Sequence, residues 1–192
     1  MRKKIEKLLQ RIEKEADKKY IIPLLALIAF TESIILPIPV DIFTFSLAAV
    51  QRKKWKIFGF VASIFSVLGA LVGYIIGFYF FRSFGEKLIH FYHYEESFRH
   101  IVELFQQNTF SIMFSSAFTP IPFKVFTLAA GFVKASFPPF ILASLVGRSS
   151  RFFLEVYLAQ KYGKQITAHF VRRFNFYTLI LAVLILVYIF FF

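Results

Sequence analysis

The sequence predicts an all-α integral membrane protein, arranged as an inverted repeat of two re-entrant hairpins that are each followed by a transmembrane helix. Three observations predict this fold class. First, 58% of the 192 residues are apolar, more than a soluble protein of this size could cover. Second, the basic residues gather beside the apolar blocks, as they do in membrane proteins. Third, a proline-containing segment occurs twice.

The N-terminal residues 1–19 are rich in charge and carry apolar side chains at helical spacing (Ile5, Leu8, Leu9 and Ile12). This pattern predicts an amphipathic helix on the membrane surface and lacks the apolar core of a cleaved signal peptide. The net charge of +12 could instead indicate a nucleic-acid-binding protein. The placement of the charge argues against that class, because basic residues beside apolar spans set topology and contact anionic lipid head groups.

Residues 20–50 form the first apolar block and are flanked on both sides by basic clusters. A single crossing would place one cluster outside, against the positive-inside tendency, so the block is expected to enter the membrane and return. Its 31 residues are too few for two crossings at ~20 residues each, which leaves a re-entrant hairpin. Pro37 and Pro39 mark the break because neither can continue a helical hydrogen-bond ladder.

Four further blocks complete the predicted topology. In chain order they are a spanning helix (57–81), a second hairpin (109–133, broken at Pro120 and Pro122), a spanning helix of opposite direction (137–160) and a C-terminal transmembrane helix (174–192). The polar residues 82–108 between the two halves are expected outside. In this scheme 16 of the 23 Lys and Arg lie on the inner side and 4 on the outer side, which predicts a cytoplasmic N-terminus.

An internal repeat relates the two halves. The segments PIPVDIFT (37–44) and PIPFKVFT (120–127) share five of eight residues, and both Gly69–Gly85 and Gly147–Gly163 run from glycine to glycine over 16 positions. The charge pattern gives the halves opposite orientations. Inverted repeats with broken helices are how many secondary transporters build alternating access, so the prolines are expected to form the break and nearby carboxylates to line a cavity.

At these residues the chain resembles the DedA family of bacterial membrane proteins, whose shared core is the VTT domain, over roughly residues 20–165. The residues that carry the resemblance are Glu32, Pro37, Pro39 and Asp41 in the first motif, Gly69, Gly73, Gly77 and Gly85 in the second, Pro120, Ala130 and Gly131 in the third, and Gly147 in the fourth. The chain departs from the pattern in two places. Ala117 and Phe123 stand where many members have arginines beside the third-motif proline, and Arg151 stands where a tryptophan is common. These departures place the chain in a divergent branch.

The resemblance implies a lipid transporter of the bacterial cytoplasmic membrane, a flippase or scramblase for undecaprenyl phosphate or a phospholipid, with activity linked to the proton gradient. It implies membrane lipids as partners and no cofactor. The lipid, the direction of transport, the coupling ion and the oligomeric state are left open.

Glu32 and Asp41 are the candidate proton-coupling residues. Ionisable groups at membrane depth are costly, so they usually face a cavity and mark a pathway. The alternative is a structural role, in which each carboxylate pairs with Arg148 or Arg151 and holds its hairpin in place.

Arg148, Arg151 and Lys124 are the candidate residues for binding a lipid head group. An arginine fork matches phosphate oxygens in a bidentate way, and the two arginines are three residues apart on one helical face. The alternative is that Arg151 is neutralised by Glu155, four residues further on.

Gly69, Gly73 and Gly77 are expected to serve close helix packing, because small residues four apart let backbones approach in lipid. The three histidines of residues 82–108 lack the tight spacing of a zinc site, and the absence of Cys excludes thiolate sites. No phosphate-binding loop or serine nucleophile motif occurs. The protein is therefore not expected to be an enzyme. A membrane scaffold is the alternative function, followed by an enzyme acting on a lipid phosphate.

Overall fold

The computed structural model describes residues 18–34, 40–80, 86–91, 93, 95–119 and 121–172. Within these ranges the chain is helical and contains no strand, which confirms the all-α class. Several predicted features lie outside the described residues. They are the N-terminal helix apart from Lys18 and Lys19, the C-terminal helix 174–192, and Pro37, Pro39, Gly85 and Pro120.

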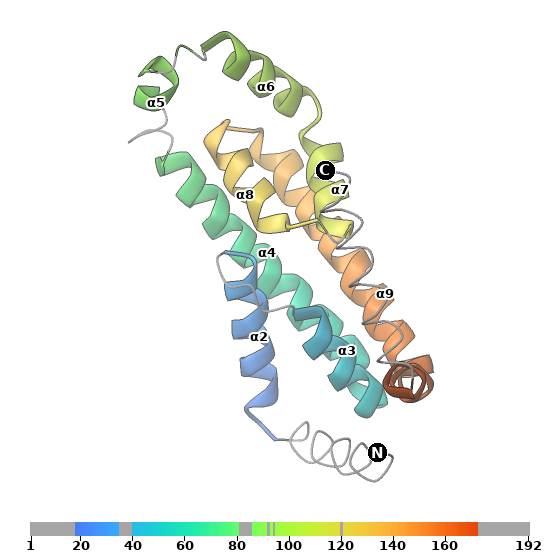
Figure 1. Ribbon diagram of the computed structural model, residues 1–192. Coiled ribbons are helices and arrows are strands. Elements are labelled where there is room, and N and C mark those ends of the chain that lie inside the picture. Colours follow the sequence, from blue (N-terminus) through green and yellow to red (C-terminus); the bar gives the residue numbers. More distant parts are fainter. Residues whose placement is uncertain are drawn as a thin grey trace.

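Each predicted hairpin is a pair of short helices, and each predicted spanning helix is a long one (Figure 1). The helices are α2 (Ile21–Glu32), α3 (Val40–Val50), α4 (Trp55–Phe80), α5 (Glu86–Phe91), α6 (Glu95–Gln107), α7 (Thr109–Phe118), α8 (Phe123–Phe132) and α9 (Phe137–Arg172), with a 3₁₀ turn, η1 (Arg52–Lys54), before α4. The hairpin helices have 10 to 12 residues. At about 1.5 Å per residue they are about 15–18 Å long, roughly half of a ~30 Å bilayer core. Each is therefore too short to cross alone, as a re-entrant hairpin requires.

The long helices α4 and α9 pack together at the centre of the molecule. Among the described residues, Arg52–Phe80 is the one stretch long and apolar enough to cross a membrane by length and composition. The second long helix, α9, covers the predicted span 137–160 but carries charged residues within it and continues to Arg172. The helix thus continues beyond the predicted span without a proline to end it, and Gly163 keeps a negative φ while it packs against Ala49.

The packing of the hairpins is symmetric about the α4–α9 pair. The first arm of each hairpin lies on the long helix of its own half, α2 on α4 and α7 on α9. The second arm lies on the long helix of the other half, α3 on α9 and α8 on α4. Figure 1 shows the two hairpins beside opposite halves of this central pair. This exchange of second arms is the arrangement expected of two repeats with opposite orientation.

The glycine stripe of α4 lies where both hairpins approach that helix. A Cβ atom added at Gly69 would collide with the backbone carbonyl of Phe30 in α2, and one added at Gly77 would collide with the carbonyl of Leu128 in α8. Between them, Gly73 faces the side chain of Thr127. Small residues at these positions therefore let α2 and α8 contact α4 at backbone distance.

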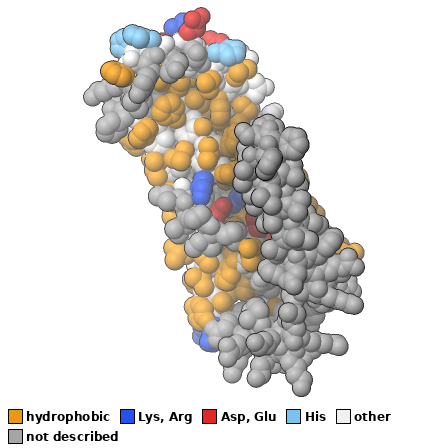
Figure 2. Space-filling view, in the orientation of Figure 1, with side chains coloured by type: hydrophobic (Ala, Val, Ile, Leu, Met, Phe, Trp, Pro, Cys, Tyr) orange, Lys and Arg blue, Asp and Glu red, His pale blue; other side chains and the backbone are white. Residues whose placement is uncertain are grey.

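Large apolar side chains cover much of the outer surface. Ile42, Phe60 and Tyr79 are each at least 60% exposed, and Figure 2 shows an extensive hydrophobic face along the molecule. Exposed apolar surface of this extent indicates contact with a membrane or partner rather than with water. The polar segment with α5 and α6 lies at one end, where Figure 2 shows histidine and acidic side chains together.

Candidate functional site

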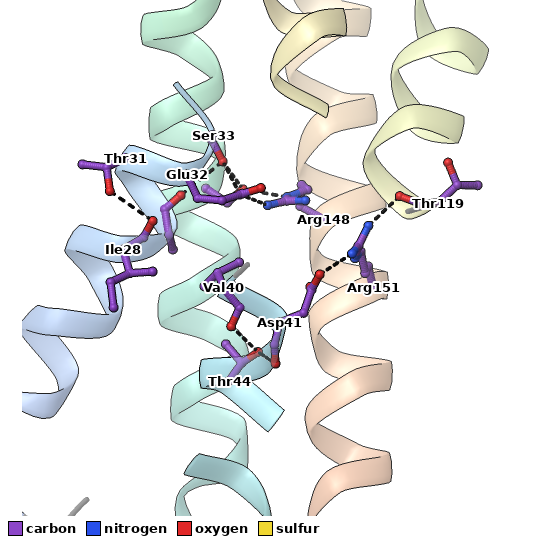
Figure 3. Close-up of polar contacts among 12 residues, drawn as sticks. Ile28, Thr31, Glu32, Ser33, Val40, Asp41, Thr44, Thr119, Arg148 and Arg151 are labelled. Carbon is purple, nitrogen blue, oxygen red and sulfur yellow. Dashed lines mark hydrogen bonds and ion pairs between the residues drawn. The ribbon is translucent and has the colours of Figure 1, made fainter. Parts of the chain in front are cut away.

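The breaks of both hairpins meet at the middle of α9. Glu32 is the last residue of α2, Asp41 is the second residue of α3, and Thr119 directly follows α7. Figure 3 shows Arg148 and Arg151 of α9 pointing toward these residues. Three of the four helix ends that flank the two breaks therefore contribute to one charged cluster. The cluster consists of Glu32, Asp41, Arg148 and Arg151 with the backbone carbonyl of Thr119.

Arg148 is almost completely buried, with 2% of its surface exposed. Its Nη2 donates a hydrogen bond to Oε2 of Glu32 at 2.9 Å, and its Nε donates to Oγ of Ser66 at 2.6 Å. The guanidinium group also lies over the rings of Phe123 and Phe152, at 5.0 and 4.7 Å from their centroids. These contacts supply the charge, hydrogen-bond and cation–π partners that a buried guanidinium needs.

A pair of serines supports the Glu32–Arg148 ion pair from behind. Oγ of Ser66 lies 2.7 Å from Oγ of Ser33, and Ser33 also donates to the backbone carbonyl of Ala29 at 3.1 Å. Both serines are buried, one on α4 and the other at the end of α2. Neither serine was predicted as a site residue, although a hydroxyl within an apolar block is a recognisable signal because it must find a partner there.

Arg151 forms the second ion pair. Its Nη2 donates a short hydrogen bond to Oδ2 of Asp41, and its Nη1 donates to the backbone carbonyl of Thr119 at 2.5 Å. One guanidinium group thus joins the start of α3 to the end of α7. The ends of both hairpins are held by a single side chain, which no local sequence pattern predicts.

Helix dipoles act differently on the two carboxylates. Asp41 lies in the first turn of α3, where the positive end of the helix dipole stabilises a negative charge. Glu32 lies at the C-terminal end of α2, where the dipole is unfavourable. Glu32 therefore depends on Arg148 for its charge compensation more than Asp41 depends on Arg151.

Glu155 lies beside this cluster on the next turn of α9. Its Oε1 lies 2.6 Å from Oγ1 of Thr44, and Asp41 and Arg151 are the charged groups that act on it. The sequence alternative that Arg151 is neutralised by Glu155 is not what the structure shows, because Arg151 directs its hydrogen bonds to Asp41 and Thr119.

The two ion pairs differ in access. The side chains of Glu32 and Arg148 are 24% and 3% exposed, whereas those of Asp41 and Arg151 are 37% and 20% exposed. Figure 2 shows charged side chains at mid-height on an otherwise apolar face. The Asp41–Arg151 pair is thus the more accessible half of the cluster.

Two other predicted site residues lie at the start of α8. Pro122 precedes the helix with φ −62° and extended backbone, so it sits at the break of the second hairpin. Lys124 follows Phe123, whose ring contacts Arg148, and its side chain is half-buried with a partner of its own. Lys124 is therefore adjacent to the cluster.

The histidines of residues 82–108 lie on two helices and in the turn between them, His90 in α5, His93 in the turn and His100 in α6. His90, near the end of α5, contacts Glu95 of α6, with 2.8 Å between Nδ1 of His90 and Oε1 of Glu95. His93, which lies between them in the chain, has a positive φ of 56°. One ligand atom from each of these three exposed residues lies within 4.8 Å of the others. Hydrogen bonds from the backbone and from His90 lower the pKa of Glu95. The expectation that these histidines form no metal site stays a prediction.

Comparison with known proteins agrees with this architecture. The sequence profile of the VTT domain, the core domain of the DedA family, matches residues 36–161. The chain belongs to the DedA family. It is therefore a membrane protein of that family. A protein of Haemophilus influenzae is 35% identical over 144 residues, covering 75% of this chain and 74% of that protein. A protein of Histophilus somni is 29% identical over 144 residues, covering 75% of both chains. Both relatives are named uncharacterized proteins. No solved structure matches the chain.

The departures from the family pattern lie next to the arginines of α9. Ala117 and Phe123 are the positions where the resemblance described above implies arginine. Gly147 packs against Ala117, and the next residue, Arg148, places its guanidinium over Phe123. Arg148 and Arg151 of α9 thus bring positive charge to the third-motif region, in addition to Lys124 of the hairpin itself.

Proposed function

We propose that this DedA protein is a lipid transporter, a flippase or scramblase, that moves an anionic lipid phosphate or phospholipid such as undecaprenyl phosphate across the bacterial cytoplasmic membrane. One observation carries the proposal. Two arginines, paired with carboxylates, join the breaks of both hairpins inside a body whose outer surface is apolar. Ionisable groups in such a position usually mark a pathway through the membrane.

Arg151 is the first residue to meet the head group in this proposal. Its side chain is 20% exposed and that of its partner Asp41 is 37% exposed, whereas Arg148 is enclosed by Glu32, Ser66 and two aromatic rings. A phosphate can take the place of the Asp41 carboxylate, because the guanidinium fork binds either anion in a bidentate way. Arg148 then keeps α2 attached to α9 while Arg151 changes partner.

Release of Arg151 from Asp41 also loosens the hairpins. The same guanidinium binds the Thr119 carbonyl, so an anion at Arg151 competes with the contacts that hold the start of α3 and the end of α7. The hairpins are related by an inverted repeat, so loosening one or the other would open the cluster toward opposite sides of the membrane. This is the alternating access that moving a head group requires.

A scaffold role leaves the charged cluster without a purpose, since one long apolar helix would anchor the chain. An enzyme acting on a lipid phosphate needs a nucleophile with a neighbouring base. Among the described residues of the cluster, the hydroxyls of Ser33 and Ser66 bond to each other, that of Ser66 also accepts from Arg148, and no histidine is present. Transport is the function that uses all of these groups.

The test is lipid movement in vesicles that contain the purified full-length protein. Two arms, one with fluorescent phosphatidylglycerol and one with fluorescent undecaprenyl phosphate, distinguish a phospholipid from a polyprenyl phosphate. The parent protein should accelerate movement over protein-free vesicles in at least one arm. Arg151→Lys keeps the charge but loses the fork, so it should slow that movement by about ten- to a hundredfold. Arg99→Lys, an exposed arginine of α6, is the matched control and should behave as the parent. Parent rates equal to those of protein-free vesicles in both arms would refute the proposal.

A further inference from the structure

The turn between α5 and α6 brings three metal-binding side chains together. His90 lies near the end of α5, His93 lies in the turn, and Glu95 is the first residue of α6. One ligand atom from each of the three lies within 4.8 Å of the other two. This histidine turn, defined as His90, His93 and Glu95, lies at the end of the molecule formed by α5 and α6, away from the charged cluster of α9 (Figures 1 and 2).

The spacing of these side chains suits a tetrahedral metal ion. Zinc binds imidazole nitrogen and carboxylate oxygen at about 2.0–2.2 Å, so two ligands of a tetrahedral ion lie about 3.3–3.6 Å apart. In the structure Nδ1 of His90 lies 2.8 Å from Oε1 of Glu95, and the rings of His90 and His93 are 6.5 Å apart with 85° between their planes. All three side chains are exposed, so small rotations bring their ligand atoms to the distance that the ion requires.

The backbone of the turn is what gathers these residues. The amide of His93 donates a hydrogen bond to the carbonyl of His90 at 3.3 Å, and His93 has a positive φ of 56°. Such a conformation is uncommon for a residue other than glycine and persists where surrounding contacts favour it. The sequence-based expectation of no metal site rested on spacing along the chain. The turn brings residues of two helices together, which that spacing does not reveal.

The ligand set selects a class of metal. Imidazole suits zinc, copper, nickel and iron, whereas magnesium and calcium prefer oxygen ligands alone. Two histidines with one glutamate hold zinc in sites that leave the fourth position to water. The alternative is a plain ion pair between His90 and Glu95, whose side chains are 83% and 45% exposed. An ion pair this exposed contributes little to stability, and it leaves His93 without a role.

A metal ion at the histidine turn would act on the second hairpin through α6. Phe98 of α6 meets Phe132 of α8 edge to face, with 5.7 Å between the ring centroids. Phe105 of α6 is buried in the same apolar core as Phe123 and Ala130 of α8. An ion that fixes α6 to α5 therefore also steadies the segment that packs on α8.

We propose that His90, His93 and Glu95 bind one divalent transition-metal ion of the zinc class and that this ion ties α5 to α6. The two imidazoles and the carboxylate supply three ligands, and water supplies the fourth. The inference does not depend on the proposed lipid transport, since its residues lie outside the charged cluster and its tests need no lipid movement.

The first measurement is titration calorimetry of the full-length protein in detergent, without a histidine tag, with Zn²⁺ as the probe. The parent should bind one ion per chain. His93→Gln and Glu95→Gln should each weaken binding at least about tenfold, the smallest loss that follows removal of even an outer-shell partner. His100→Gln and Glu103→Gln, at exposed positions of α6 outside the histidine turn, are the matched controls and should bind as the parent does. Parent affinity in His93→Gln, equal losses in the controls, or equally tight binding of Mg²⁺ would overturn the proposal.

The second measurement is cleavage by chymotrypsin, which cuts after aromatic residues. Phe91 directly follows His90 and is 76% exposed, so the turn is open to attack. An ion that joins α5 to α6 should slow this cleavage in the parent by up to about a hundredfold at free Zn²⁺ of about 100 times Kd. His93→Gln should be cleaved at the same rate with Zn²⁺ and with EDTA, whereas His100→Gln should be protected as the parent is. Parent cleavage that saturating Zn²⁺ leaves unchanged would overturn the claim that the ion ties the two helices.

Discussion

Removing the charge of Glu32 should destabilise the protein strongly, because Arg148 would remain buried without its anion. The side chain of Arg148 is 3% exposed, and breaking a buried ion pair by removing one partner costs about 3–5 kcal/mol. Glu32→Gln leaves Arg148 its bond to Ser66 and its contacts with Phe123 and Phe152, which places the loss near ~3 kcal/mol, the lower end of that range. For a protein of this size, ~3 kcal/mol corresponds to a fall of roughly 6–12 °C in Tm.

The assay is thermal unfolding of the purified protein in detergent, followed by circular dichroism. Arg148→Met and the double variant Glu32→Gln/Arg148→Met complete a double-mutant cycle. The double variant has no uncompensated charge, so its Tm should lie above that of Glu32→Gln alone. Asp41→Asn is the matched comparison at the more exposed pair, and its loss should be about 1 kcal/mol or less.

The opposite ranking would contradict this reasoning. If Glu32→Gln unfolds within a degree or two of the parent, Arg148 is not held by the carboxylate. If the double variant loses as much as the two single variants added together, the pair has no coupling energy and the contact between Glu32 and Arg148 contributes nothing to stability.

Two further predictions concern packing and topology. Gly77→Leu should abolish the folded state, because any Cβ at Gly77 meets the Leu128 carbonyl, and the loss should be seen as aggregation on size-exclusion chromatography. Ile76→Leu, on the exposed side of α4, is the control. A monodisperse Gly77→Leu protein would contradict the close approach of α4 and α8. Single cysteines at the exposed residues Lys19 and Arg52 should both be labelled only from the cytoplasmic side by a membrane-impermeant thiol reagent. The reason is that basic clusters on both sides of the first hairpin favour the cytoplasmic side of the membrane. Labelling of the two cysteines from opposite sides would make residues 20–50 an ordinary span.

The positions of the breaks between the paired short helices could be predicted because their signals are local. Prolines cannot continue a helix, and α7 ends at Phe118 while α8 begins at Phe123, on either side of Pro120 and Pro122. The basic clusters on both sides of residues 20–50 carry the same kind of local information about topology. The repeat within the sequence also anticipated that the two halves would pack in equivalent ways.

The pairing within the cluster could not be predicted because its partners are far apart in the chain. Arg148 and Glu32 are separated by 116 positions, and Arg151 and Asp41 by 110. Residues four apart in a helix are neighbours, so the sequence offered Glu155 as an alternative charge partner for Arg151. In the fold, α3 brings Asp41 to Arg151 and Thr44 to Glu155, so tertiary packing replaces the local pair.

The end of α9 was also beyond local reasoning. The basic residues after position 160 predict an aqueous environment, but charge does not end a helix when no proline or left-handed glycine follows. Gly163 instead serves as a contact for Ala49 of α3, which depends on where the first hairpin lies. The same type of residue therefore packs helices here and at Gly69.

The place where a lipid head group contacts the protein tests the central claim most directly. Vesicles with the full-length protein and a phosphatidylglycerol bearing a photoreactive head group should give crosslinks that map to the start of α3, the end of α7 and the middle of α9. These are the regions of Asp41, Thr119 and Arg151. Arg151→Gln should remove most of this labelling, whereas Arg99→Gln should not. Crosslinks confined to the basic residues at the helix ends, unchanged by Arg151→Gln, would contradict a lipid path through the cluster between the hairpins.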